Sequence, residues 1–138
     1  MLETSDIVEI HHLIALYGHA ADAPEENLLP LVFTEDGVWE ARTDRFAHIS
    51  SNRLDGREAI AGMFAMGVPP NSPSHHTTNI WVREEGGQVK VRSKWIAHPE
   101  RGIYMGDYND IVVKTPQGWR IKHRVVTFRY VEGEVAAA

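Results

Sequence analysis

A histidine and an aspartate in this chain could together remove a proton from a carbon atom. Asp22 lies at the predicted end of the first helix, and His75 opens a predicted strand much later in the chain. A neutral imidazole, with an ordinary pKa of about 6.5, accepts a proton near neutral pH. An aspartate on its other ring nitrogen fixes the tautomer and stabilises the imidazolium that forms. Two other roles stay open here: Asp22 capping the helix that Pro24 opens, and His75 serving as a hydrogen-bonded core residue.

His76 competes with His75 for the same role. Because adjacent strand residues point to opposite faces of a sheet, only one of the two can face a cavity. Thr77 and Asn79 share the parity of His75 and would give its face a polar lining. We therefore expect His75 to point inward and His76 to point towards a partner subunit.

A second polar group could come from the last predicted strand. His123 shares a face with the apolar residues before it, but the apolar residues after it alternate on the opposite face. A β-bulge near Arg124 explains this change and leaves open whether His123 or Arg124 points inward. An inward arginine could bind a developing oxyanion or a leaving group, and an inward histidine could act as a second acid. The alternative is a solvated stripe of cations on the outer face.

Aromatic residues are distributed over the predicted elements in a way that favours an apolar, ring-sized ligand. Tyr17 shares a helix face with Ile10 and Ile14, so its hydroxyl could enter a cavity as a hydrogen-bond donor. The alternative for each tyrosine is a core ring whose hydroxyl is satisfied at the rim. The candidate substrate-binding residues are Trp39, Phe64, Asn79, Trp95, Tyr104 and Tyr108.

The sequence indicates no metal or cofactor site. Its eight histidines include no His-x3-His pair, and the chain has no cysteine to supply a thiolate ligand. No glycine-rich nucleotide loop precedes a helix, because Gly86 and Gly87 are typical of a hairpin turn. We expect neither a metal nor a cofactor.

Three helices are predicted in the first half of the chain. Apolar residues at three- and four-residue steps predict a first helix that Asp6 caps and that ends before Pro24. Pro24 also fits the first turn of a short second helix. The turn at Gly56 leads into a third helix, which ends at Gly67.

Period-two alternation predicts strands in the second half. The predicted strands cover residues 38–42, 75–84, 88–97, 103–114 and 119–130. The last four are separated by short turns rich in glycine or proline, as hairpins require. Helices followed by long strands predict an α+β fold, in which three N-terminal helices cover the concave face of a curved antiparallel sheet.

Composition sets the broad class of protein. The 138 residues predict a single domain over 1–138, with 43% hydrophobic and 24% charged residues as in globular proteins. A net charge of −5 argues against nucleic acid or an anionic membrane as partner. The first residues carry neither a basic cluster nor an apolar run, so we expect a cytoplasmic protein.

An ordered set of motifs runs along almost the whole chain. It consists of Tyr17-x4-Asp22, Phe33-Thr34-Glu35-Asp36-Gly37-Val38-Trp39, Gly56 before Ile60, His75-x3-Asn79, Gly106-x-Tyr108-x-Asp110 and Gly118-Trp119-Arg120-Ile121-x2-Arg124. This set resembles the SnoaL-like branch of the nuclear transport factor 2-like fold, a cone of one curved sheet and three helices. That fold hosts dehydratases, isomerases, cyclases, non-catalytic subunits and binding modules, so the resemblance implies a fold rather than one reaction.

Two enzyme groups of that superfamily are guides to the site: scytalone dehydratase and hexachlorocyclohexane dehydrochlorinase. Both use an aspartate–histidine dyad, and the resemblance implies that Asp22 and His75 occupy those positions. It also implies a pocket tryptophan at Trp39 and a pocket arginine at Arg124. Tyr17 stands where the dehydrochlorinase has a lysine, so neither enzyme's substrate is implied for this chain.

Residues and resemblance together predict a cofactor-independent lyase or isomerase. His75 would take a proton from a small, apolar, cyclic molecule, Asp22 would orient His75, and a tyrosine or Arg124 would assist at the oxygen or leaving group. One alternative is a non-catalytic binding or accessory domain of the same fold. A third is a small subunit resembling the β subunit of ring-hydroxylating dioxygenases. Alternating basic and apolar residues on the outer sheet face predict a homodimer.

Overall fold

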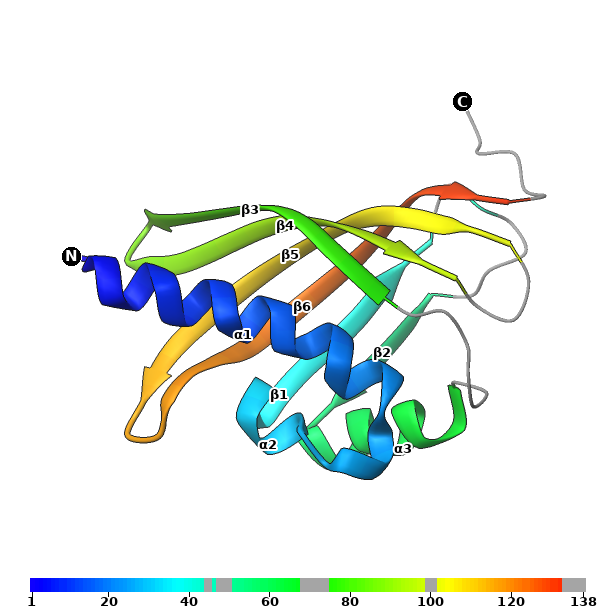
Figure 1. Cartoon of the computed structure of the whole chain (residues 1–138), viewed down its shortest axis with the longest axis horizontal. Coiled ribbons are helices and arrows are strands. Elements are labelled where there is room, and N and C mark those ends of the chain that lie inside the picture. The colour runs from blue at the N-terminus through cyan, green and yellow to red at the C-terminus, as the bar shows by residue number, and fades with distance from the viewer. Residues whose placement is uncertain (44–45, 47–50, 68–74, 99–101, 133–138) are drawn as a thin grey trace.

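The structure is a computed structural model that describes residues 1–43, 46, 51–67, 75–98 and 102–132. Its helical segments come first and four long strands follow, in the order that the sequence predicts (Figure 1). The elements are α1 (Thr4–Asp22), the 3-10 turn η1 (Pro24–Glu26), α2 (Leu29–Val32), β1 (Phe33–Arg42), β2 (Asn52–Asp55), α3 (Arg57–Gly67), β3 (His75–Glu85), β4 (Gln88–Ala97), β5 (Tyr104–Thr115) and β6 (Gly118–Val131).

Among the described residues, six strands form one curved, unclosed sheet in the order β2-β1-β6-β5-β4-β3. Neighbouring strands run antiparallel, except that β1 and β6 are parallel. The parallel pair arises because the meander from β3 to β6 returns its last strand beside β1. The α+β fold predicted from the sequence is therefore confirmed, with one parallel pairing in place of a wholly antiparallel sheet.

The helix α1 lies along the inner face of the sheet, and α2 and α3 lie at one end beside β1 (Figure 1). The apolar stripe of α1 packs into the core, with Ile10 and Ile14 fully buried. Glu3 rather than Asp6 is the N-cap of this helix, and the Asp6 carboxylate accepts a hydrogen bond from the Glu3 N–H at 3.0 Å. No helix in the described part of the chain is long and apolar enough to cross a membrane.

A β-bulge in β6 decides whether His123 or Arg124 faces inward. The register with β5 shifts between Ile121 and His123, so Lys122 is the extra residue of this bulge. Arg124 therefore shares the inner face with Ile121, whereas His123 lies on the outer face. The bulge predicted near Arg124 is present, and it settles which of the two neighbours points inward.

Two further differences from the predicted elements concern β1 and β3. The strand β1 begins at Phe33 rather than residue 38, because α2 ends after a single turn at Val32. The strand β3 has its own register shift between Thr78 and Trp81. Asn79 lies in that shift with a left-handed φ of 54°, so the simple alternation expected after His75 stops there.

Candidate functional site

The Asp22 carboxylate and the His75 imidazole are in direct contact. Asp22 Oδ1 lies 2.7 Å from His75 Nδ1, and Asp22 Oδ2 accepts the backbone N–H of His75 at 2.9 Å. Because an ionised carboxylate only accepts hydrogen bonds, this geometry assigns the ring proton to Nδ1. The other ring nitrogen, Nε2, then carries a lone pair and has no hydrogen-bond partner among the described residues.

Both side chains of this dyad are half-buried, with 28% of His75 and 19% of Asp22 exposed. They open onto a hollow of about 290 Å³, which is large enough for a molecule of one or two rings. The hollow is lined by Ala15, Gly18, His19, Asp22, His75, His76 and Thr77. A small molecule in it would therefore lie against the imidazole.

Gly18 allows α1 and β3 to approach closely enough for this contact. A Cβ at Gly18 would lie 3.2 Å from the His75 carbonyl oxygen, tighter than ordinary van der Waals contact. Asp22 is one helical turn further along the same face, which places its carboxylate beside the first residue of β3. The absence of a side chain at Gly18 thus positions the dyad.

Tyr17 lies behind the dyad in a cluster of packed rings. Its ring makes edge contacts with Phe64 and Tyr108, at centroid distances of 5.7 and 5.3 Å, and with His75 at 6.4 Å. Trp95 stacks on Tyr108 at 5.9 Å. All but His75 are at least 94% buried, so Phe64, Trp95 and Tyr108 belong to the packed core of the inner face.

Arg124 is fully buried in the same region and its charge is compensated. Its Nε and Nη2 donate to the two Asp110 carboxylate oxygens at 2.8 and 2.7 Å. Its guanidinium lies 3.9 Å from the ring centre of Tyr17 and 3.8 Å from that of Tyr108. Burial disfavours the charge, but the Asp110 carboxylate more than offsets this and raises the pKa of Arg124. Arg124 therefore stays charged and paired.

His123 lies on the opposite face of the sheet from the dyad. Its Nε2 is 3.1 Å from Glu40 Oε1, and the side chain is 27% exposed. The structure thus brings together Asp22, His75 and Tyr17, with Arg124 in contact with Tyr17, and it places His123 elsewhere.

The remaining predicted residues have different surroundings. Trp39 Nε1 donates to the Tyr17 hydroxyl at 2.9 Å. Tyr104 is half-buried and its ring contacts Phe128, with the centroids 6.5 Å apart. Asn79 is exposed in the β3 register shift, so it does not share the face of His75 as expected.

Two residues of the site were missed by reasoning from the sequence. His19 lines the hollow and lies three residues before Asp22 on α1, so helical periodicity back from Asp22 could have found it. Asp110 has the parity of Tyr108 on β5, which could have placed it on the inner face. Within the described ranges, no group of three or more histidine, aspartate or glutamate side chains is arranged to hold a metal ion.

Comparison with known proteins identifies relatives of this chain. The model of the SnoaL-like domain family matches residues 2–125. An uncharacterised protein of Mycobacterium tuberculosis is 30% identical over 137 residues, covering 91% of this chain and 86% of the relative.

Solved structures share the fold at lower sequence identity. An NTF2-like protein with a cystatin-like fold from Novosphingobium aromaticivorans matches with a TM-score of 0.71 and 24% identity, covering 94% of this chain and 84% of that one. From the same organism, a candidate scytalone dehydratase matches with a TM-score of 0.66 and 21% identity, covering 95% of this chain and 91% of that one. The β subunit of a candidate aromatic-ring-hydroxylating dioxygenase, also from that organism, matches with a TM-score of 0.69 and 16% identity, covering 94% of both chains. At these identities the likeness establishes the nuclear transport factor 2-like fold alone.

Proposed function

The chain belongs to the SnoaL-like domain family, and from this premise we propose that it is a cofactor-independent lyase or isomerase with His75 as general base. The observation that carries the proposal is the 2.7 Å contact between Asp22 and His75 beside an open hollow. A structural neighbour described as a candidate scytalone dehydratase is consistent with this chemistry.

The mechanism follows from the tautomer of His75. Nε2 takes a proton from an acidic C–H of a small, apolar, cyclic molecule in the hollow, and the C–H electron pair stays on the substrate. Asp22 holds Nδ1–H and stabilises the imidazolium that results. The imidazolium then returns its proton to another carbon in an isomerisation, or to a departing group in an elimination.

Hydrogen exchange into a simple ketone tests the base. 2-Tetralone, a bicyclic ketone with acidic C–H bonds, is incubated with the protein in D₂O and its deuterium content is followed by mass spectrometry. We expect His75→Gln to slow the protein-dependent exchange by about 10²–10⁴-fold, the usual contribution of a positioned base. An exchange rate unchanged in His75→Gln would contradict the assignment.

Nitrogen NMR tests the dyad independently of any substrate. The ¹⁵N chemical shifts of His75 report which ring nitrogen carries the proton, and we expect the Nδ1–H form in the wild-type protein. Asp22→Ala removes the acceptor and should mix the two tautomers. Glu40→Ala is the matched control, because it removes the carboxylate partner of His123 and leaves His75 untouched.

A non-catalytic binding or accessory domain is the second candidate function. Two observations favour it: the inner face is filled by packed rings around Trp95 and Tyr108, and the charge of Arg124 is already balanced by Asp110. The solved β subunit shares the fold. Two results together would support this candidate over the enzyme. One is binding of 2-tetralone without protein-dependent deuterium exchange, and the other is a His75 tautomer that is the same in wild type and Asp22→Ala.

We also propose that the protein is a homodimer that associates through the outer face of its sheet. Helices pack only on the inner face among the described residues, so the outer face of six strands is uncovered (Figure 1). Apolar side chains remain exposed there, including Trp81 at 56% and Tyr130 at 47%.

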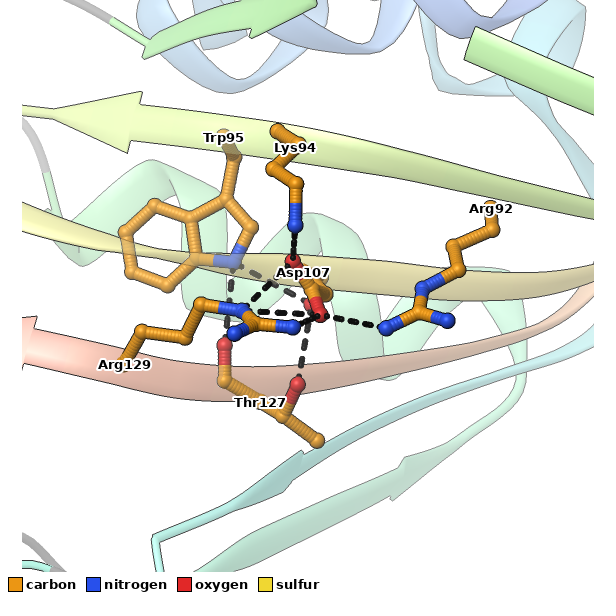
Figure 2. Close-up of polar contacts among 6 residues, drawn as sticks. All are labelled: Arg92, Lys94, Trp95, Asp107, Thr127 and Arg129. Atoms are coloured by element: carbon orange, nitrogen blue, oxygen red, sulfur yellow. Dashed lines mark hydrogen bonds and ion pairs between the residues drawn. The ribbon is translucent and has the colours of Figure 1, made fainter. Parts of the chain in front are cut away.

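A cluster of cations interrupts this outer face. Arg92, Lys94 and Arg129 surround the Asp107 carboxylate, which accepts hydrogen bonds from all three (Figure 2). Asp107 is buried, and although burial alone would raise its pKa, these cations hold the pKa well below its usual range. The cluster therefore keeps a net positive charge, which would pair with acidic groups of an opposing subunit.

A further inference from the structure

We propose that the cation cluster of Arg92, Lys94 and Arg129 on the outer face of the sheet binds a phosphate dianion, either free or as the phosphate group of a small monoester. The cluster is built on β4 and β6, on the opposite face of the sheet from the dyad. The site is therefore separate from the hollow beside His75, and it does not rest on the proposed lyase or isomerase activity.

The cluster holds more positive charge than its own carboxylate balances. Lys94 Nζ lies 3.0 Å from Asp107 Oδ1. Arg92 Nη2 and Arg129 Nη2 lie 3.2 and 2.7 Å from the other oxygen, Oδ2. Three cations thus share one carboxylate, and no other described residue accepts a hydrogen bond from them. Two positive charges are left without a counter-charge, in a chain whose net charge is −5.

The three cations are ordered and still open to solvent. The Asp107 side chain is only 6% exposed, whereas those of the three cations are 45–53% exposed. Because a guanidinium carries five N–H groups and an ammonium three, each cation keeps N–H groups that Asp107 does not use. An anion on this surface would therefore meet donors that are already held in place, which lowers the entropy lost on binding.

A second β-bulge in β6 belongs to this arrangement. The register with β5 shifts between Phe128 and Tyr130, so Arg129 is the extra residue. From this position its Nε and Nη2 both donate to the Asp107 carboxylate. A bulge re-aims a side chain at a cost in regular pairing, and here it brings a third cation to a carboxylate that two others already contact.

The backbone under the cluster is tied to the core. Trp95 Nε1 reaches from the inner face and donates to the carbonyl oxygens of Asp107 and Thr127, both at 3.2 Å (Figure 2). Gly106 leaves the room for this close packing, because a Cβ there would overlap the Thr127 carbonyl oxygen. The strands that carry Asp107 and Arg129 are therefore held at a fixed separation.

The charge and the donors of the cluster match a phosphate group. Two unbalanced positive charges equal the charge of the dianion. A guanidinium fork can bind two phosphate oxygens, and the remaining oxygens can accept from donors that arrive from other directions. Nucleic acid and anionic membranes also offer phosphate, but the net charge of −5 repels such extended anions. A small phosphate compound is the class that remains.

Calorimetric titration with inorganic phosphate tests the site. The titration is made at about pH 8, where phosphate carries two charges, and at an ionic strength held constant with sodium chloride, so that screening does not change. Arg129→Gln removes one charge and its fork. We expect the affinity for phosphate to fall about tenfold to hundredfold in this variant, the usual effect of losing hydrogen bonds to a charged group. Arg129→Lys keeps the charge without the fork and should bind with an affinity between the two.

Arg53→Gln is the matched control. Arg53 has the same 53% exposure as Arg129, but it pairs one to one with Asp55 at β2, so its loss should leave the affinity for phosphate unchanged. Side-chain ¹⁵N NMR locates the bound anion. Phosphate should shift the Nε signals of Arg92 and Arg129 and leave that of Arg53 in place.

Phenyl phosphate distinguishes the two sources of the phosphate group. Next to Arg129, Tyr130 and the Met105 opposite it are 47% and 36% exposed. Tighter binding of phenyl phosphate than of inorganic phosphate would assign the site to a monoester with an apolar body, and equal affinities would assign it to free phosphate.

Three outcomes would overturn the inference: no binding of phosphate to the wild-type protein, the same affinity in wild type and Arg129→Gln, or equal affinities for phosphate and nitrate at one ionic strength. Sedimentation velocity identifies the rival occupant in the first case. If Arg92→Gln/Arg129→Gln then dissociates the proposed homodimer, an acidic group of the opposing subunit occupies the cluster instead.

Discussion

Arg124 shows how a residue can have the right type and position for ligand binding while its charge is already used in the fold. Asp110 accepts two of its N–H groups, and the rings of Tyr17 and Tyr108 both contact the guanidinium. Its Nη1 is buried and has no hydrogen-bond partner among the described residues. By contrast, His75 keeps an unused nitrogen at an open hollow. Arg124 is therefore expected to contribute mainly to the free energy of unfolding and not to ligand binding.

Removing Arg124 alone should destabilise the protein strongly. Arg124→Met leaves the Asp110 carboxylate buried without a partner, and breaking such a pair costs about 3–5 kcal/mol. The double variant Asp110→Leu/Arg124→Met removes both charges and should recover most of this loss. Urea denaturation of the three proteins measures the effect. A single variant as stable as the wild type would show that the pair does not hold the inner face together.

At this scale the sequence predicts side-chain direction better than side-chain partners. Strand parity was enough to place His75 inward, because it stands at the start of β3, before the register shift. The partner of Arg124 could not be predicted, because its contact with Asp110 depends on a bulge at Lys122 that sets the β5–β6 register. The hydrogen bond from Trp39 to Tyr17 could not be predicted either, because it joins a helix to a strand and depends on how the two pack together.

The element that positions the site is α1, which is fixed at both ends. Near its N-terminus, Asp6 accepts hydrogen bonds from Lys114 Nζ at 2.8 Å and from Trp119 Nε1 at 3.0 Å, which ties the helix to the β5–β6 hairpin. At its C-terminus, Asp22 binds the first residue of β3. A helix held at two points along its length keeps Tyr17, between them, in a constant place.

The contact at Asp6 should make stability depend on pH. The Lys114 ammonium, then the N–H groups of Glu3 and Trp119, lower the pKa of Asp6 well below its usual range. A carboxyl whose pKa is lower in the folded state stabilises the fold above its unfolded pKa of about 3.9, and this stabilisation is lost as the pH falls through the folded value. Thermal unfolding of wild type and Asp6→Asn should therefore differ most at neutral pH, and the difference should begin to shrink below about pH 4 and continue to shrink as the pH falls towards the folded pKa. A constant difference across that range would contradict this.

Two glycines in helices provide a matched test of the α1–β3 contact. Replacing glycine by alanine inside a helix stabilises it by about 0.5–1 kcal/mol through backbone entropy. A Cβ at Gly62 in α3 would have no atom of the described residues within 4 Å, so Gly62→Ala should raise the melting temperature. Gly18→Ala meets the His75 carbonyl oxygen at 3.2 Å, so it should gain less or lose stability. Gly18→Ala should also change the His75 ¹⁵N chemical shifts. An equal rise in melting temperature in both variants, with unchanged His75 shifts, would argue against a close contact between α1 and β3.

Element boundaries were predicted best where turns are unambiguous. The strands β3, β4, β5 and β6 begin and end within one residue of their predicted limits, because glycine- and proline-rich turns separate them. The segment before β1 was harder, because Leu28 to Phe33 is apolar throughout and Pro30 suits the first turn of a helix. Periodicity cannot separate a short buried helix from the start of a buried strand.

For the molecule as a whole, the two faces of the sheet differ in what covers them. The helix α1 lies along the inner face (Figure 1). Tyr17 of α1 packs there against the rings around it. The outer face carries exposed Trp81 and Tyr130, with the cation cluster of Arg92, Lys94 and Arg129 between β4 and β6. Apolar side chains left exposed on a broad sheet are typical of an interface between subunits.

If the outer face forms the proposed homodimer, a charge placed on that face should separate the subunits. Tyr130 lies opposite Met105 in the β5–β6 register, and both side chains are exposed in the single chain, at 47% and 36%. Tyr130→Glu would bury a carboxylate on each side of the interface, so we expect sedimentation velocity to show a monomer. Met66→Glu is the control, because Met66 is 87% exposed on α3, away from the outer face, and should leave the dimer intact.

The dyad should keep its His75 tautomer in the Tyr130→Glu monomer, because Asp22 and His75 belong to one chain. A wild-type monomer, or a dimer that only Met66→Glu dissociates, would reject this interface.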